Sequence, residues 1–163
     1  MPKLLAFVGG IHGAGKSFYV NSLSQRLSIP CVSAGQLIYK QNMTDKNVKN
    51  IDENQDALIR AFSQLSGQNY LMDGHYTLLN SIGAIERIDQ NIFQQLNPEK
   101  LILVKTDPQI IMGRLAERDS KRYSIQLLTA MQEAEENYYL ELCCLLGKDI
   151  DIVNGLDNFH NLL

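Results

Sequence analysis

The chain has 163 residues, of which 45% are apolar and 20% are charged, and its formal net charge is −3 at pH 7. A chain of this length can form one stable domain that buries roughly 68–70% of its unfolded surface. The acidic balance argues against a protein whose main task is to bind nucleic acid or an anionic membrane. No apolar run approaches the roughly 18 residues of a membrane span. Cys31, Cys143 and Cys144 have neither disulfide nor metal-ligand spacing, so we expect free thiols in the cytoplasm.

The first third of the chain alternates between apolar and helical patterns. Lys3–Val8 is apolar on both faces, which predicts a buried strand ending at two glycines. We expect a helix from about Lys16 to Leu27 and a short second strand at Cys31–Ser33. The segment of about 35–66 is more polar and contains two helical stretches, so we interpret it as a helical insert within the same domain.

The rest of the chain repeats the pattern of strand and helix. Tyr70–Met72 and Leu101–Val104 are predicted strands, and a helix is expected from about Gln109. A long helix over about Ser124–Leu146 precedes a fifth strand at Ile150–Val153. Five short strands separated by helices indicate an α/β domain with a five-stranded parallel sheet and helices on both faces.

Polar and glycine-rich segments follow the predicted strands. Gly9–Ser17, Ser33–Gln36, Asp73–His75, Asp107 and Asn154 all fall at carboxyl ends. In a parallel sheet these ends form one edge, where ligands bind. We therefore expect the functional residues to meet there.

The segment Gly10–Ser17 matches the phosphate-binding pattern G-x-x-x-x-G-K-[ST], between a predicted strand and a predicted helix. Its backbone N–H groups are expected to surround phosphate oxygens, and Lys16 to reach the β- and γ-phosphates of ATP. The Ser17 hydroxyl is a candidate ligand of Mg²⁺. The predicted ATP-binding residues of this segment are Gly10, Gly13, Ala14, Gly15, Lys16, Ser17 and the adjoining Phe18.

Two further features suggest phosphoryl chemistry. Asp73 follows the third strand, where a carboxylate can hold Mg²⁺ through a water molecule; a simple turn at Asp73-Gly74 is the competing interpretation. Arg114, Arg118 and Arg122 are four residues apart, so a helix would place them on one face. Such a row can stabilise a transferring phosphoryl group, or it can be a solvated charged face.

Together these segments resemble the P-loop nucleoside monophosphate kinases, nearest the archaeal-type adenylate kinases and related small nucleotide kinases. The resemblance spans nearly the whole chain. His75, two residues after Asp73, favours the archaeal-type branch, whereas Gln36–Lys40 lacks the arginine that many members carry there. The segments that carry the resemblance are Gly10–Ser17, Val32–Gly35, Tyr70–His75, Leu101–Asp107, Gly113–Arg118 and Ile152–Gly155.

The resemblance implies transfer of the γ-phosphoryl group of Mg-ATP to a small acceptor, with AMP the first candidate. It implies catalytic roles for Lys16, Asp73 and the three arginines, a short lid at about 114–124, and ATP contact at Asn154. The insert of about 35–66 would bind the acceptor. Candidate acceptor-binding residues are Ser33, Gly35, Lys40, Arg60, Gly74 and His75.

Three alternatives remain open at this stage. The acceptor can be another small molecule or a nucleic-acid end, and the chain can be a regulatory ATPase that switches a partner. Lys40 and Arg60 can equally be solvated helix residues. Nucleotide substrates are expected, stable binding to nucleic acid is not, and the sequence identifies no protein partner.

Overall fold

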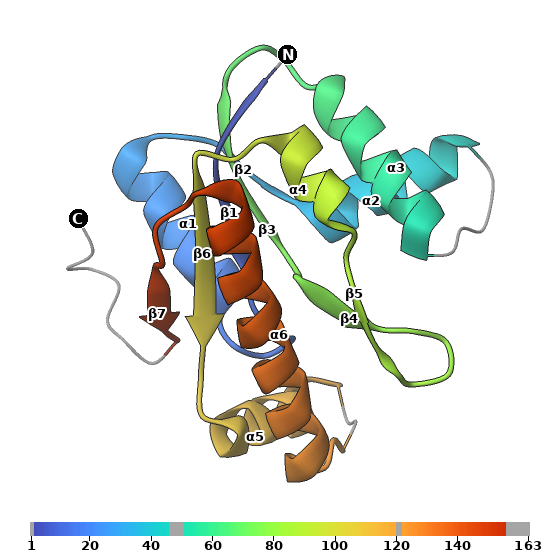
Figure 1. Cartoon of the computed structure of the whole chain (residues 1–163), viewed down its shortest axis with the longest axis vertical. Helices are drawn as coiled ribbons and strands as arrows, with labels where there is room; N and C mark the ends of the chain where they lie inside the picture. The colour runs from blue at the N-terminus through green and yellow to red at the C-terminus, as the bar shows by residue number, and fades with distance from the viewer. Residues whose placement is uncertain (1, 46–50, 120–121, 156–163) are drawn as a thin grey trace.

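The computed structural model describes residues 2–45, 51–119 and 122–155. Its central sheet contains five parallel strands, which confirms the predicted fold class (Figure 1). Their order across the sheet is β2 (Cys31–Ser33), β3 (Asn69–Gly74), β1 (Lys3–Gly9), β6 (Lys100–Lys105) and β7 (Ile152–Asn154). The strand that leads into Gly10–Ser17 is therefore central, with β3 on one side and β6 on the other.

Helices cover both faces of the sheet (Figure 1). Side chains alternate along β6: Leu101 and Leu103 belong to one hydrophobic cluster, whereas Ile102 and Val104 belong to the other. This two-sided burial explains why the strand sequences are continuously apolar. The helices are α1 (Lys16–Leu27), α2 (Ala34–Asp45), α3 (Ile51–Ser63), α4 (Gln90–Leu96), α5 (Pro108–Asp119) and α6 (Ile125–Leu146).

A small hairpin and a short helix were not anticipated from the sequence. Strands β4 (Thr77–Leu79) and β5 (Ile85–Arg87) pair in antiparallel fashion, and α4 follows them. Each strand has three residues, which is too short for an alternating pattern to stand out. The Asn80 side chain, which accepts hydrogen bonds from Ile82 N and Ala84 N in the connecting loop, is the local signal for this turn.

Aromatic rings pack tightly where the hairpin joins the sheet. Tyr76 is completely buried, and its ring centroid lies 5.3 Å from that of Phe7 and 5.5 Å from that of Phe93. A Cβ atom at Gly9 would lie 2.3 Å from the Tyr76 ring. Glycine at this position therefore lets the end of β1 approach the segment that follows β3. In the part of the chain that the structure describes, we find no helix with the length and apolar character needed to cross a membrane.

Candidate active site

The loop Gly10–Ser17 joins the central strand β1 to the start of α1, as the motif predicts. Gly13 and Gly15 have φ angles of 87° and 97°, which L side chains rarely adopt. Gly15 precedes the first turn of α1, and no side chain caps this end of the helix. The exposed N–H groups and the positive end of the helix dipole together favour an anion at this position.

Three side chains from distant segments hold the carbonyl groups of this loop. His75 Nδ1 lies 2.9 Å from Gly10 O, Arg114 Nη1 lies 2.9 Å from Gly13 O, and Thr106 Oγ1 lies 2.8 Å from Ala14 O. Because a carbonyl oxygen only accepts, each of these side chains is the donor. These hydrogen bonds fix the loop from its carbonyl side.

The turn after β7 completes this support. Gly155 N donates to Lys105 O at 2.6 Å, and a Cβ atom at Gly155 would lie 2.0 Å from Ala14 O. Only glycine fits so close to the loop backbone. Asn154, a predicted ATP contact, is exposed beside this turn and lines a cavity of about 420 Å³ together with Thr106, Asp107 and Gln132.

Lys16 and Asp73 form the charged centre of the site. Only 8% of Lys16 is exposed. This burial lowers the pKa of Lys16, whereas the negative charges of Asp73 and Glu135 raise it. Asp73 lies at the end of β3 and is half-buried. Burial raises its pKa, while Lys16 and a hydrogen bond from Ser33 oppose the rise. The structure thus brings the predicted residues Lys16, Asp73 and Ser33 together.

The oxygen donors at this centre suit Mg²⁺. Ser17 offers an exposed hydroxyl at the start of α1, and Asp73 offers a carboxylate at the end of the neighbouring strand. Mg²⁺ prefers such oxygen ligands and keeps several waters when it binds between one or two protein groups and a phosphate. Residues 2–45, 51–119 and 122–155 contain no cluster of three His, Cys, Asp or Glu side chains that could hold a metal.

The three arginines occupy different environments. Arg114, on α5, is half-buried against Gly13 O, whereas Arg118 is exposed one turn later. The positive charge of Arg118 nevertheless helps to lower the pKa of Lys16, so the Arg118 guanidinium lies on the same side of α5 as the phosphate-binding loop. Arg122 is exposed beyond the end of α5, so the three do not share one helix. The lid remains a prediction, and its residues 120–121 fall outside the described part of the chain.

A cavity of about 280 Å³ lies beside the charged centre, among α2, α3, α4 and the hairpin. Gly35, Gly74 and His75, three of the predicted acceptor residues, line it. Lys40 and Arg60 are exposed and do not line it. Phe18, at 63% exposure, points away from the core.

Sequence reasoning missed Glu135. This carboxylate is fully buried on α6 and accepts hydrogen bonds from Tyr76 N at 2.7 Å, Thr77 N at 2.9 Å and Thr77 Oγ1 at 2.5 Å. It thereby holds the segment that follows Asp73 and His75. The available signal was a charged residue within the apolar stripe of a helix, seven residues after Leu128 and four before Tyr139.

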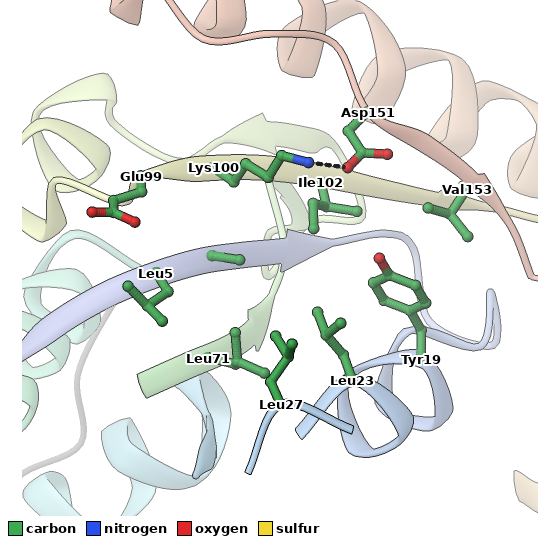
Figure 2. Close-up of a pocket in the computed structure, with 11 residues that line it drawn as sticks. Leu5, Tyr19, Leu23, Leu27, Leu71, Glu99, Lys100, Ile102, Asp151 and Val153 are labelled. Carbon is green, nitrogen blue, oxygen red and sulfur yellow. Dashed lines mark hydrogen bonds and ion pairs between the residues drawn. The ribbon is translucent and has the colours of Figure 1, made fainter. Parts of the chain in front are cut away.

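A larger cavity, of about 460 Å³, lies on the α1 face of the sheet and away from this site. Figure 2 shows Tyr19, Leu23 and Leu27 of α1 facing apolar side chains of the strands. Lys100 and Asp151 form an ion pair of 2.9 Å at one side of it. None of the predicted site residues lines this cavity.

The sheet, the loop after β1 and Asp73 at the end of β3 define a P-loop nucleotide-binding domain of the kinase type. A family model described as "AAA domain" matches residues 9–130, and the chain belongs to this family. An adenylate kinase from Methanoculleus marisnigri is 27% identical over 133 residues, which cover 71% of this chain and 69% of that protein.

Two solved structures share the fold. A gluconokinase from Sinorhizobium meliloti 1021 superposes with a TM-score of 0.55 and 13% identity, covering 97% of this chain and 85% of that one. An uncharacterized protein from Eubacterium ventriosum has a TM-score of 0.53 and 14% identity, with 95% and 91% covered. Together these findings confirm the resemblance to the P-loop kinases.

Proposed function

We propose that this protein is a Mg²⁺-dependent phosphotransferase that moves the γ-phosphoryl group of ATP to a small acceptor, with AMP the first candidate. The observation that carries the proposal is the position of the phosphate-binding loop. The loop places Lys16 close to Asp73, and a separate cavity lined by Gly74 and His75 adjoins this charged pair. A donor at the loop and an acceptor in the cavity could therefore bind at the same edge of the sheet, on either side of Asp73.

The donor half rests on the loop and its surroundings. The N–H groups at the start of α1 and the Lys16 ammonium group offer positive charge to the β- and γ-phosphates. We assign the cavity lined by Thr106, Asp107 and Asn154 to the rest of the donor nucleotide. When bound, Mg²⁺ would neutralise charge on the phosphates, and Ser17 and Asp73 would hold it, Asp73 through a water molecule.

Catalysis would come from positioning and electrostatic stabilisation rather than from a covalent intermediate. Lys16 stands at the γ-phosphate in this proposal, and Arg118 would reach the transferring group when the lid of about 114–124 closes. Arg114 has a different task here, because its guanidinium already binds Gly13 O. Closure would exclude water and so favour transfer over hydrolysis.

The acceptor half rests on the 280 Å³ cavity. Its predicted residues Gly35, Gly74 and His75 adjoin Asp73, so an acceptor held there would face the phosphoryl group. The adenylate kinase similarity supports a nucleoside monophosphate. All three cysteines are free thiols, which supports the predicted cytoplasmic location.

The test is phosphoryl transfer from labelled ATP to a panel of nucleoside monophosphates, nucleosides, sugar acids and an oligonucleotide 5′-hydroxyl end, with and without Mg²⁺. We expect Mg²⁺-dependent label in a nucleoside diphosphate, and most strongly with AMP. Release of inorganic phosphate at the same rate with every acceptor, and no labelled product, would identify an ATPase instead.

A further inference from the structure

Thr106 follows strand β6, and a side chain rather than a neighbouring strand holds its backbone. Thr106 N donates to Gln132 Oε1 at 3.1 Å, and Gln132 Nε2 donates to Thr106 O at 2.8 Å. Strand β6 ends at Lys105, the last of its residues that pairs with β7, so Thr106 lies beyond the sheet. The Gln132 amide therefore offers Thr106 one donor and one acceptor, as the backbone of an adjacent strand would.

These two hydrogen bonds involve both peptide units that flank the Thr106 Cα atom. The N–H group belongs to the planar unit before it and the C=O group to the planar unit after it, so fixing both sets the direction of the Thr106 side chain. One turn further along α6, Glu136 Oε2 lies 2.5 Å from Lys105 Nζ in a half-buried ion pair. Helix α6 thus holds two consecutive residues where β6 ends.

The Thr106 side chain in turn holds the phosphate-binding loop. It is almost completely buried, and its Oγ1 atom donates to Ala14 O at 2.8 Å. The Ala14 C=O group and the Gly15 N–H group belong to one planar trans peptide unit, in which they point in opposite directions. A hydroxyl group on the Ala14 carbonyl therefore turns the Gly15 N–H group away from Thr106. Gly15 precedes the first turn of α1, where an anion is favoured.

We propose that Gln132 is a positioning residue for the phosphates of the donor. Its amide group fixes Thr106, the Thr106 hydroxyl group fixes the Ala14 carbonyl group, and the Gly15 N–H group is thereby aimed at a phosphate oxygen. This role rests on the proposed function and deepens its donor half. Gln132 also lines the cavity of about 420 Å³ that we assign to the rest of the donor, so direct contact with the base or the ribose is the competing role.

The test compares the affinities of ATP and inorganic tripolyphosphate, each with Mg²⁺, by calorimetry of the whole chain. Tripolyphosphate has the phosphates of ATP without the base and the ribose. Gln132→Met keeps most of the side-chain volume and removes both hydrogen bonds to Thr106. We expect it to bind both ligands about tenfold more weakly, because the loop no longer presents its N–H groups in a fixed direction. The KM for the acceptor should not change.

Two results would overturn the positioning role of Gln132. Weaker binding of ATP alone would show that the side chain contacts the base or the ribose. Unchanged binding of both ligands would show that the loop keeps its shape without the amide. Thermal unfolding is measured on the same preparations, because Gln132→Met leaves two Thr106 backbone groups without a partner and should lower the melting temperature. If this variant does not fold, Gln132→Asn replaces it, since water can bridge the shorter amide to Thr106, and the same losses are expected in the same direction.

A second pair of variants tests the link from Thr106 to the loop. Thr106→Val has nearly the same shape and keeps its backbone bonds to Gln132, but it lacks the hydroxyl group. We expect it to weaken tripolyphosphate binding as much as Gln132→Met does. The double variant should bind no more weakly than either single variant, because both changes break the same series of contacts. Additive losses would contradict this route. Thr106→Ser, which retains the hydroxyl group, should bind tripolyphosphate nearly as the wild type does.

The matched control is Gln126→Met, an exposed glutamine on the same helix, which should leave both affinities unchanged. The outcomes also separate this role from the proposed function. If the protein transfers no phosphoryl group but Gln132→Met weakens tripolyphosphate binding, the phosphotransferase function is wrong and the positioning role stands. If transfer occurs and Gln132→Met binds both ligands as the wild type does, the function stands and the positioning role is wrong. A wild type that binds no tripolyphosphate would overturn the positioning role as well.

Discussion

Lys16 is a charged side chain that burial makes costly for the folded protein, since burial lowers its pKa. Lys16→Met keeps most of the side-chain volume and removes the charge. We expect turnover with ATP to fall about 100-fold or more, because a charged donor aimed at the phosphates is lost. The melting temperature should be unchanged or higher, because a buried ammonium group is lost as well.

The measurements are steady-state kinetics and thermal unfolding of the same preparations. Lys148→Met, at a half-exposed position after α6, is the control and should behave as the wild type. If Lys16→Met retained most of its activity, the loop would not have the phosphate-binding role proposed for it.

His75 should make the free energy of unfolding depend on pH. Its pKa falls from 6.5 to about 3 on folding because the ring is buried, and Lys16 adds to the shift. Between these values the unfolded chain binds the proton and the folded chain does not. Stability is therefore lost as the pH falls from about 6.5 towards 3. Asp73 and Glu135, whose pKa values burial raises, act in the opposite direction, so the contribution of His75 must be isolated.

The variant His75→Asn isolates the contribution of His75 to the pH dependence of stability, because an asparagine amide can donate to Gly10 O and does not titrate. We expect the loss of stability between pH 7 and pH 5, measured by urea unfolding, to be smaller in this variant than in the wild type. Equal losses in the two proteins would show that the His75 ring gains its proton as readily in the folded chain as in the unfolded one.

At the scale of elements, α6 holds the segment that follows β3 in place through hydrogen bonds. Glu135 accepts three hydrogen bonds there, and its removal leaves three buried donors without a partner. We expect Glu135→Ala to lower the free energy of unfolding by about 3–5 kcal/mol. Turnover should fall too, because Asp73 and His75 lie directly before the released segment.

Urea unfolding measures the loss of stability in Glu135→Ala, and steady-state kinetics measures the loss of turnover. Glu133→Ala, exposed on the same helix, should change stability by no more than about 0.5 kcal/mol. A small loss in Glu135→Ala would mean that water or another group replaces the carboxylate.

The elements that the sequence predicted are those with a local signature. The central strands β1, β3 and β6 are apolar on both faces, and the phosphate-binding loop has a fixed spacing of glycine, lysine and serine, so both are visible in the sequence. The hairpin of β4 and β5 is missed because its short strands leave no period. The contact of Arg114 with Gly13 O joins residues 101 positions apart, and no local pattern encodes such a contact.

At the scale of the whole molecule, the phosphate-binding loop is shaped by segments from the entire chain. Gly155 lies so close to Ala14 that Gly155→Ala would place a Cβ atom 2.0 Å from Ala14 O and 2.1 Å from Thr106 Oγ1. We expect the loop to shift and the KM for ATP to rise about tenfold, with stability lowered by about 1–3 kcal/mol.

The matched control is Gly113→Ala, within α5, where a Cβ atom meets nothing within 4 Å. This change should stabilise the protein by about 0.5–1 kcal/mol, because alanine favours the helix. ATP titrations and urea unfolding of both variants provide the comparison. An unchanged KM in Gly155→Ala would show that the loop keeps its shape without this contact.

The contact between Gly155 and Ala14 also bears on how the protein is made. During translation the phosphate-binding motif leaves the ribosome more than a hundred residues before the glycine that packs against it. Arg114 and Thr106 emerge in between. The motif is thus present in the nascent chain long before its carbonyl groups are held in place. We expect ATP to bind tightly only after Gly155 has emerged, so that nucleotide stabilises the folded domain rather than guiding its early folding.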